Sequence, residues 1–340
     1  MSKPNGTLWL HIGTEKTGTT SIQRFLHDNR KRLLQAGVFV PSSLGHENHK
    51  MLAAYALELN SRDIALRSQN VSNSPADVMA FQAKVRKKFT DEVQAARFEH
   101  CVVSTEDLQR LYQDSEINRL FALLRPLFAR IVVVLYLRRQ DVLATSRRYT
   151  LLLHGDTNSD VFPKKSDNFY DYHSLVTRWT RQVADDDMCI VQYRERVEGV
   201  KFDALTSFCE VIGIPLEGMV MPKLLNVSLD ATNQLVMLAL NRQGDTVDPA
   251  LRKFVLDQLG KYSDPSAHFV SRRQAEEFYQ RFAAGNDQLA QRFLKREQLF
   301  STDFSMYPEE NQYRKVSEAA MSRLLEILAA SRAAAAPPPA

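Results

Sequence analysis

The sequence predicts an α/β protein, a three-layer fold with a mainly parallel central sheet and added C-terminal helices. Short apolar segments alternate with helical patterns, as in strands joined by crossover helices. One of these segments, Ile131 to Leu137, is continuously apolar and rich in β-branched residues, as in a parallel strand buried on both faces. After Asp203 the pattern is almost entirely helical to about Ala330. These three observations define the predicted architecture.

The predicted elements follow one another in a regular order. Thr7 to Ile12 predicts a short buried strand, and a turn rich in Gly and Thr comes next. An amphipathic helix is predicted from about Thr19 to Gln35, before Gly37. The remaining predictions for the first two thirds of the chain are strands over 38–40, 101–103, 131–137 and 189–193, and helices over 49–59, over 75–98 and from Asp141 onward.

A chain of 340 residues is long enough for one large α/β domain or two small ones. We expect a single domain over residues 1–332, with a core at about 7–200 and helical elaboration over about 201–332. Residues 333–340 contain only Ala and Pro, which predicts a disordered, low-complexity tail.

The composition excludes several classes of protein. Hydrophobic residues make up 44% and charged residues 25% of the chain, as in a soluble globular protein. The net charge of +4 is too small to indicate a nucleic-acid partner. The three cysteines form no CxxC pair, so no disulfide framework or cysteine-zinc site is predicted. We expect a cytoplasmic protein, because there is no pattern of a signal peptide and no apolar run that would span a membrane.

The turn over residues 13–21 has the composition of a phosphate-binding loop. Small residues let backbone N–H groups converge on an anion, and the positive end of the following helix points at the same place. Hydroxyl groups within the turn are expected to add donors. The predicted phosphate-binding residues are Gly13, Lys16, Thr17, Gly18, Thr19, Thr20 and Ser21.

The loop differs from a Walker A loop, in which Lys directly follows the second Gly. Here Thr19 follows Gly18, and the lysine is Lys16. A lysine inside the loop is expected to lie beside the first phosphate and its bridging oxygen. That position suits a donor with a 5′-phosphate and one transferable group.

Residues 16–20 read Lys-Thr-Gly-Thr-Thr and resemble the 5′-phosphosulfate loop of sulfotransferases that use 3′-phosphoadenosine 5′-phosphosulfate (PAPS). The wider stretch 11–23 is similar to the bacterial branch of that superfamily. The resemblance implies a P-loop-like fold, PAPS as co-substrate and no required metal. It also implies transfer of a sulfuryl group to a hydroxyl acceptor, a carbohydrate, a glycolipid or another small metabolite.

The second signature of that superfamily is an Arg at the end of a buried strand and a Ser eight positions later, which together bind the 3′-phosphate of the donor. Arg138 and Ser146 have this spacing. A guanidinium group makes a bidentate clamp on phosphate, and a hydroxyl in the next helix can reach the same group. Arg139 is the alternative clamp, although the spacing favours Arg138. Both arginines are otherwise interpreted as surface charges beside Asp141.

Sulfuryl transfer needs a cation at the leaving phosphate and a base on the acceptor hydroxyl. Lys16 is the predicted cation. Glu106, after the strand at 101–103, is the first candidate for the base, by analogy with related enzymes. An equally strong interpretation is a helix start in which Ser104 and Asp107 form a capping box and Glu106 is an acidic residue of the first turn.

Some relatives keep their base after the phosphate-loop helix, so His49 and Glu47 are the second candidates. His46, Glu47 and His49 could also offer metal ligands, but they have no recognised ligand spacing, and no metal is expected. His11, at the end of the first strand, is interpreted as a structural or donor-orienting residue.

Two other functions compete with sulfuryl transfer. The first is a P-loop nucleotide kinase or NTPase, which would depend on Mg²⁺ and ATP. The second is a non-catalytic protein with a sulfotransferase-like fold that binds a nucleotide. Such a binder would keep the phosphate loop and tolerate loss of the acceptor base.

Overall fold

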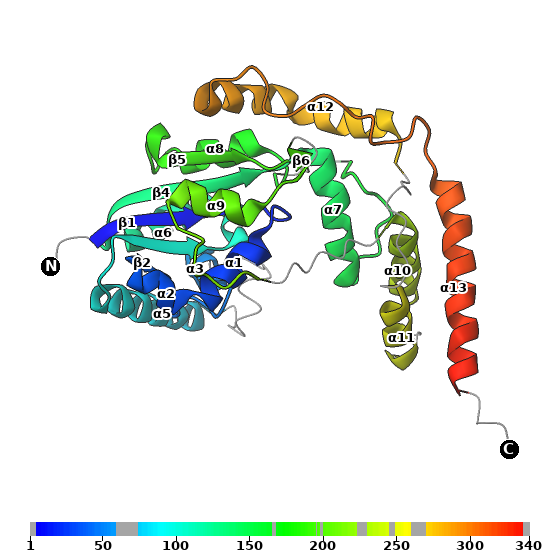
Figure 1. Ribbon diagram of the computed structural model, residues 1–340, viewed down its shortest axis with the longest axis horizontal. Helices are drawn as coiled ribbons and strands as arrows, with labels where there is room; N and C mark the ends of the chain where they lie inside the picture. Colours follow the sequence, from blue (N-terminus) through cyan, green and yellow to red (C-terminus); the bar gives the residue numbers. More distant parts are fainter. Residues whose placement is uncertain are drawn as a thin grey trace. The chain divides into compact units, whose positions relative to one another are not determined.

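The computed structural model describes residues 5–58, 74–164, 168–194, 196–197, 200–222, 230–244, 249–259 and 270–335. The structure contains a five-stranded sheet (Figure 1), whose strands lie in the order β2-β3-β1-β4-β5. Each neighbouring pair in this sheet is parallel. The strands are β1 (Asn5–His11), β2 (Val38–Phe39), β3 (His100–Ser104), β4 (Phe128–Leu137) and β5 (Met188–Gln192). The predicted α/β class and parallel sheet are therefore confirmed.

The chain divides into two compact units that interleave in the sequence. The first consists of Met1–Arg138, Asp167–Leu224 and Ala284–Phe300, and the second of Arg139–Ser166, Leu225–Ala283 and Ser301–Ala340. A helix that begins at Gln140 belongs to the second unit, and one that begins at Ala204 belongs to the first. The organisation as a single domain stays a prediction.

The first unit contains the sheet and the helices that cover it. Its helical elements are α1 (Thr19–Asp28), α2 (Arg30–Gln35), α3 (Lys50–Ala56), α5 (Pro75–Ala95), η1 (Glu106–Arg110), α6 (Asp114–Leu124), α8 (Tyr172–Trp179), η2 (Asp185–Asp187), α9 (Ala204–Ile212) and η4 (Ala290–Leu294). A small antiparallel pair, β6 (Arg196–Val197) and β7 (Val200–Lys201), was not predicted.

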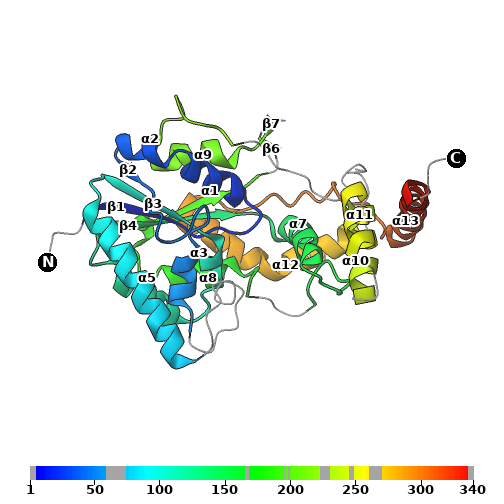
Figure 2. The same cartoon turned by 90° about the horizontal axis from the view of Figure 1, so that it is seen from below.

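Helices cover both faces of the sheet and form the three layers. Figure 2 shows α1, α2 and α9 on one side of the strands and α3, α5 and α8 on the other. On the first side, a buried cluster joins Phe25, Leu33, Val134 and Phe208. On the second side, α5 buries Phe89 although half of its other residues are polar. The sheet is thus buried on both faces, which explains the continuous apolar run of β4.

The second unit is helical within its described residues. Its helices are α7 (Gln140–Leu153), α10 (Ala231–Gln243), α11 (Pro249–Leu259) and α13 (Tyr313–Ala335), and α12 (Arg272–Leu289) begins in this unit and ends in the first. A buried cluster with Val236, Met237 and Val255 joins α7, α10, α11 and α13. No helix among the described residues is both long and apolar enough to cross a membrane.

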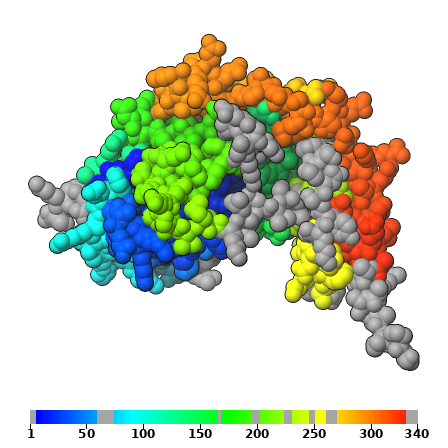
Figure 3. Space-filling model, viewed as in Figure 1, coloured from blue at the N-terminus to red at the C-terminus, as the bar shows by residue number. Residues whose placement is uncertain are grey.

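Two of the differences from the predicted boundaries have a clear cause. The helix predicted to run to Gln35 is interrupted at Asn29, whose side-chain amide donates to the carbonyl oxygens of Phe25 and Val220, both at 2.9 Å. The segment after α9 is tied to this break, and Figure 3 shows it lying against α1 and α2. At the other end, α13 continues to Ala335, because alanine favours helix and the first proline of the predicted tail is Pro337.

Candidate functional site

The loop between β1 and α1 is held against β4 by backbone hydrogen bonds. The Thr14 N–H donates to the Tyr136 carbonyl at 2.9 Å, and the Tyr136 N–H donates to the Gly13 carbonyl at 2.7 Å. Inside the loop, the buried Thr17 hydroxyl donates to the Thr14 carbonyl at 2.6 Å. The Thr17 hydroxyl therefore helps to shape the loop, and its role in binding phosphate stays a prediction.

Glycine is required at two positions of the loop. Gly13 and Gly18 have φ angles of 100° and 87°, in the region that disfavours side chains. A Cβ atom at Gly18 would lie 2.6 Å from the Cβ of Ala204, and one at Gly13 would lie 3.1 Å from Glu106. The glycines therefore allow both the turn and the close approach of α9 and η1 to the loop.

The first turn of α1 faces this loop. Gly18 is the N-cap residue, and no side chain caps the helix. The first N–H groups of a helix have no acceptor within the helix, and they carry its partial positive charge. Thr20 is exposed, whereas Thr19 is buried and Ser21 is half-buried. The arrangement provides backbone donors for an anion beside Lys16.

Lys16 and Arg138 are brought together from β1 and β4. The Arg138 guanidinium donates to the Lys16 carbonyl at 2.9 Å and lies 5.2 Å from the ring centre of Tyr193. The Tyr172 hydroxyl donates to the Arg138 carbonyl at 2.6 Å and fixes the end of β4. Burial and the positive charge of Arg138 lower the pKa of Lys16, while Glu15 and Glu106 raise it. Two cations thus lie at the carboxyl end of the sheet.

Arg139 has a different environment from Arg138. Its guanidinium makes a bidentate ion pair with the buried Asp141, at 2.8 and 2.9 Å. It also donates to the carbonyl oxygens of Ser301 and Asp303 and lies 4.2 Å from the ring centre of Phe304. These contacts occupy both edges of the guanidinium, so the geometry favours Arg138 as the phosphate clamp. The alternative interpretation treats both arginines as surface charges beside Asp141. It does not fit Arg139, because the ion pair of Arg139 with Asp141 is largely buried.

Ser146 lies half-buried on α7, in the second unit. Arg138 is the last residue of the first unit. The predicted pairing of this serine with Arg138 therefore continues to rest on their spacing in the sequence.

Glu106 lies beside the loop, at the carboxyl end of β3. Its carboxylate accepts a hydrogen bond from the Gln23 side chain at 2.6 Å. Burial raises its pKa, the hydrogen bond from Gln23 lowers it, and the charges of Asp107 and Glu15 raise it further. The carboxyl group is thus close enough to Lys16 to affect the pKa of that lysine. Because its own pKa is raised, it loses its proton at a higher pH than an ordinary Glu.

The helix start at this position differs from the predicted capping box. Thr105 is the N-cap residue, and its hydroxyl accepts from the Asp107 N–H at 3.3 Å. Ser104 instead contacts His11, with 2.8 Å between its hydroxyl and Nδ1. Glu106 is still an acidic residue in the first turn of this helix. That position does not prevent its carboxylate from acting as a base.

Two supporting contacts were not predicted from the sequence. Gln23 points from α1 toward Glu106, and Arg110 of η1 forms an ion pair with Glu15 of the loop. Gln23 has the helical spacing of the buried face of α1, which is the available signal for an inward-facing polar residue. Nothing local in the sequence indicates that Glu15 and Arg110 meet.

His49 is fully buried, and both of its ring nitrogens are occupied. Nδ1 accepts from the Ser104 N–H at 2.9 Å, so Nε2 carries the proton and donates to the Pro41 carbonyl at 3.0 Å. Burial, followed by the charge of Arg30, lowers the pKa of His49 to about 4. These bonds support a structural role, since they leave no ring nitrogen for an acceptor hydroxyl.

The other candidates near the phosphate-loop helix face elsewhere. Glu47 lies 3.8 Å from the Arg24 guanidinium, and the exposed His46 contacts His27. His27 is in the last turn of α1, about 12 Å along the helix axis from Thr19. His11 is buried, and burial lowers its pKa to about 3. Of the candidate bases, Glu106 is the one that the fold places beside the loop.

No protein-family model matches the chain, and no curated protein matches it either. Two solved structures are similar to it. The sulfotransferase domain from the Synechococcus PCC 7002 olefin synthase has 14% identity, covers 83% of this chain and 96% of its own, and has a TM-score of 0.33. The sulfotransferase domain from the curacin biosynthetic pathway has 14% identity, covers 94% and 99%, and has the same TM-score.

Both structures are described as sulfotransferase domains, which is the class that the sequence motifs resemble. Because the identities and TM-scores are low, the function proposed below rests on the residues of the site.

Proposed function

We propose that the protein is a sulfotransferase that moves a sulfuryl group from PAPS to a hydroxyl acceptor, a carbohydrate, a glycolipid or another small metabolite. The proposal is supported by one observation: Lys16, Arg138 and Glu106 lie close together at the carboxyl ends of neighbouring parallel strands. This edge is where open α/β sheets bind their ligands. A cation for the leaving phosphate, a second cation and a carboxyl base are the groups that the transfer requires.

The proposed chemistry is an in-line displacement at sulfur. The acceptor oxygen forms a bond to sulfur while the bond between sulfur and the 5′-phosphate oxygen breaks, and adenosine 3′,5′-bisphosphate leaves. Lys16 and the N–H groups of the first turn of α1 stabilise the charge that develops on the leaving oxygen. The carboxylate of Glu106 takes the proton of the acceptor hydroxyl. Gln23 orients that carboxylate through its 2.6 Å hydrogen bond.

The position of the lysine argues against a nucleotide kinase. Lys16 has a φ angle of 61° inside the loop, and Thr19 stands where a Walker A loop has its lysine. A non-catalytic nucleotide-binding role has one observation in its favour. Burial raises the pKa of Glu106, so a smaller fraction of this side chain is the carboxylate that can accept a proton at a given pH.

A comparison of ligands separates these functions. Adenosine 3′,5′-bisphosphate is expected to raise the melting temperature, because a ligand at about 100 times its Kd stabilises the native state by about 2.7 kcal/mol. Adenosine 5′-monophosphate is expected to raise it less, and Mg-ATP is expected to have little effect. A shift with Mg-ATP alone contradicts the proposal. Stabilisation by the bisphosphate without consumption of PAPS in an acceptor screen would indicate the non-catalytic role.

Arg138→Ala is expected to weaken binding of the bisphosphate by about 10- to 100-fold, since a hydrogen bond to a charged group contributes about 1.5–3 kcal/mol. Binding of adenosine 5′-monophosphate should change much less if Arg138 holds the 3′-phosphate. Calorimetric titration of both nucleotides measures the two effects. An equal loss for both would mean that Arg138 only supports the loop through the Lys16 carbonyl. Arg130→Ala, an exposed arginine at the amino end of β4, is the matched control.

A further inference from the structure

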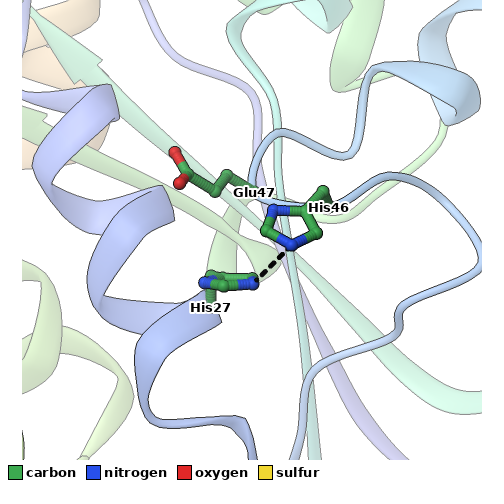
Figure 4. Close-up of side chains that lie close together, drawn as sticks. All are labelled: His27, His46 and Glu47. Atoms are coloured by element: carbon green, nitrogen blue, oxygen red, sulfur yellow. Dashed lines mark hydrogen bonds between the residues drawn. The ribbon is translucent and has the colours of Figure 1, made fainter.

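Three potential metal ligands lie together at the end of α1 opposite the phosphate loop. His27 is in the last turn of α1, and His46 and Glu47 are on the segment between β2 and α3. Figure 4 shows the two rings close together, joined by a hydrogen bond, with the Glu47 side chain beside them; Nε2 of His27 and Nε2 of His46 lie 3.1 Å apart. One ligand atom from each of the three residues lies within 4.8 Å of the other two.

The distance between the two ring nitrogens suits a tetrahedral ion. Two nitrogen atoms bound to Zn²⁺ at about 2.0–2.1 Å lie roughly 3.3–3.4 Å apart in tetrahedral geometry, close to the separation of the two rings. Two imidazoles and one carboxylate are a ligand set that zinc accepts. A slight opening of the contact between His27 and His46 would place an ion between the nitrogen atoms and within reach of Glu47.

The other ring nitrogen of His27 has the partner that metal-binding histidines usually have. Nδ1 lies 2.9 Å from a carboxylate oxygen of Asp28. A carboxylate on Nδ1 holds the proton there, turns Nε2 into the ligand atom and increases its basicity. The carboxyl end of α1 also favours a cation through the helix dipole.

The segment that carries His46 and Glu47 is held in a fixed conformation. The Arg30 guanidinium donates to the carbonyl oxygens of Pro41, Gly45 and His46, at 3.2, 3.1 and 2.6 Å. Glu92 accepts from two N–H groups and one hydroxyl of the same segment. Because these bonds already hold the backbone, little further ordering of it is needed when an ion binds.

Positive charges nearby oppose a cation. Arg24 lies 3.8 Å from the Glu47 carboxylate and would have to release it, and Arg30 is bonded to the His46 carbonyl. Both arginines are on the surface or half-buried, where solvent reduces their repulsion. The carboxylates of Asp28 and Glu47 offset these charges.

We propose that His27, His46 and Glu47 bind one Zn²⁺ ion, with Asp28 orienting His27. Three protein ligands leave a fourth position for water or another small ligand. The ion would connect the carboxyl end of α1 to the segment before α3. This site is separate from the phosphate loop and is independent of the proposed sulfuryl transfer.

The test uses the tag-free full chain, freed of metal with a chelator and titrated with Zn²⁺ against a chromophoric chelator. One ion per chain is expected, and substitution by Co²⁺ should give the visible bands of a tetrahedral ion without a sulfur charge-transfer band. His46→Ala is expected to weaken zinc binding by more than about 100-fold. Asp28→Asn should weaken it by about 10- to 100-fold, as the loss of such an orienting partner does.

His173→Gln, an exposed histidine of α8, is the control and should bind zinc as the unchanged protein does. Circular dichroism confirms that each variant is folded. Equal zinc binding by the unchanged protein and by His46→Ala would overturn the proposal, and His27 and His46 would then be a hydrogen-bonded pair only. A cobalt spectrum with a sulfur band would also overturn it by pointing to cysteine. Stabilisation by adenosine 3′,5′-bisphosphate is measured separately, so either proposal can fail without the other.

Discussion

Lys16→Ala is expected to lower the turnover of PAPS by about 10²–10³-fold, the usual cost of removing one group that stabilises charge in a transition state. The lysine is close enough to Arg138 and Glu106 for their charges to affect its pKa, and we propose that it contacts the leaving oxygen. Turnover is measured as formation of adenosine 3′,5′-bisphosphate from PAPS. The reaction is run with water and with the hydroxyl compound that raises the rate most in an acceptor screen.

Two further variants distinguish an effect on the transfer reaction from an effect on nucleotide binding. Lys16→Met keeps the length of the side chain and removes its charge, so it should lose turnover as Lys16→Ala does. Lys31→Ala, an exposed lysine of α2, should turn over PAPS at the unchanged rate. If both Lys16 variants kept their turnover while still binding the bisphosphate, Lys16 would not be the cation at the leaving phosphate.

Glu106→Gln is expected to lower turnover by about 10²–10⁴-fold, the range that general-base catalysis contributes. The glutamine can still accept the hydrogen bond from Gln23, so the loop and its affinity for the bisphosphate should be unchanged. The same turnover and titration measurements check both effects. Glu99→Gln, an exposed residue next to the amino end of β3, is the matched control.

The dependence of turnover on pH tests the proposed roles of Glu106 and Lys16. Burial raises the pKa of Glu106, so the basic carboxylate forms at a higher pH than for an ordinary Glu, and turnover should rise with pH through that raised pKa. Burial and Arg138 lower the pKa of Lys16, so turnover should fall at a lower alkaline pH than for an ordinary Lys. Glu106→Gln should remove the rise and keep the fall. Unchanged turnover in this variant would leave Glu106 with the helix-start role alone.

Much of the fold could be predicted because its signals are local. The apolar run of β4 and the alternation of strands and helices indicate a parallel sheet without knowledge of the long-range contacts. The break at Asn29 could not be predicted, since it depends on Val220, which is 191 positions away in the sequence. The division of the chain into two interleaved units has the same kind of cause, because it depends on which helices pack together.

In the candidate site, too, some features depend on local sequence and others on long-range contacts. The order of residues in the phosphate loop and the position of an arginine directly after β4 are properties of the sequence alone. Which of two adjacent arginines turns toward the loop depends on distant partners. Arg139 is held by carbonyl oxygens more than a hundred positions later, at Ser301 and Asp303, and Arg138 is left to reach Lys16.

The histidines after the loop were the least predictable part. His46 and His49 are close in the sequence and chemically equivalent there, yet one is exposed beside His27 and the other is buried between Pro41 and Ser104. The sequence by itself determined the sheet, the loop and the cations at its edge, because periodicity and residue order act over short distances. The tertiary structure decided which side chains face one another, because burial and hydrogen-bond partners come from segments far apart in the chain.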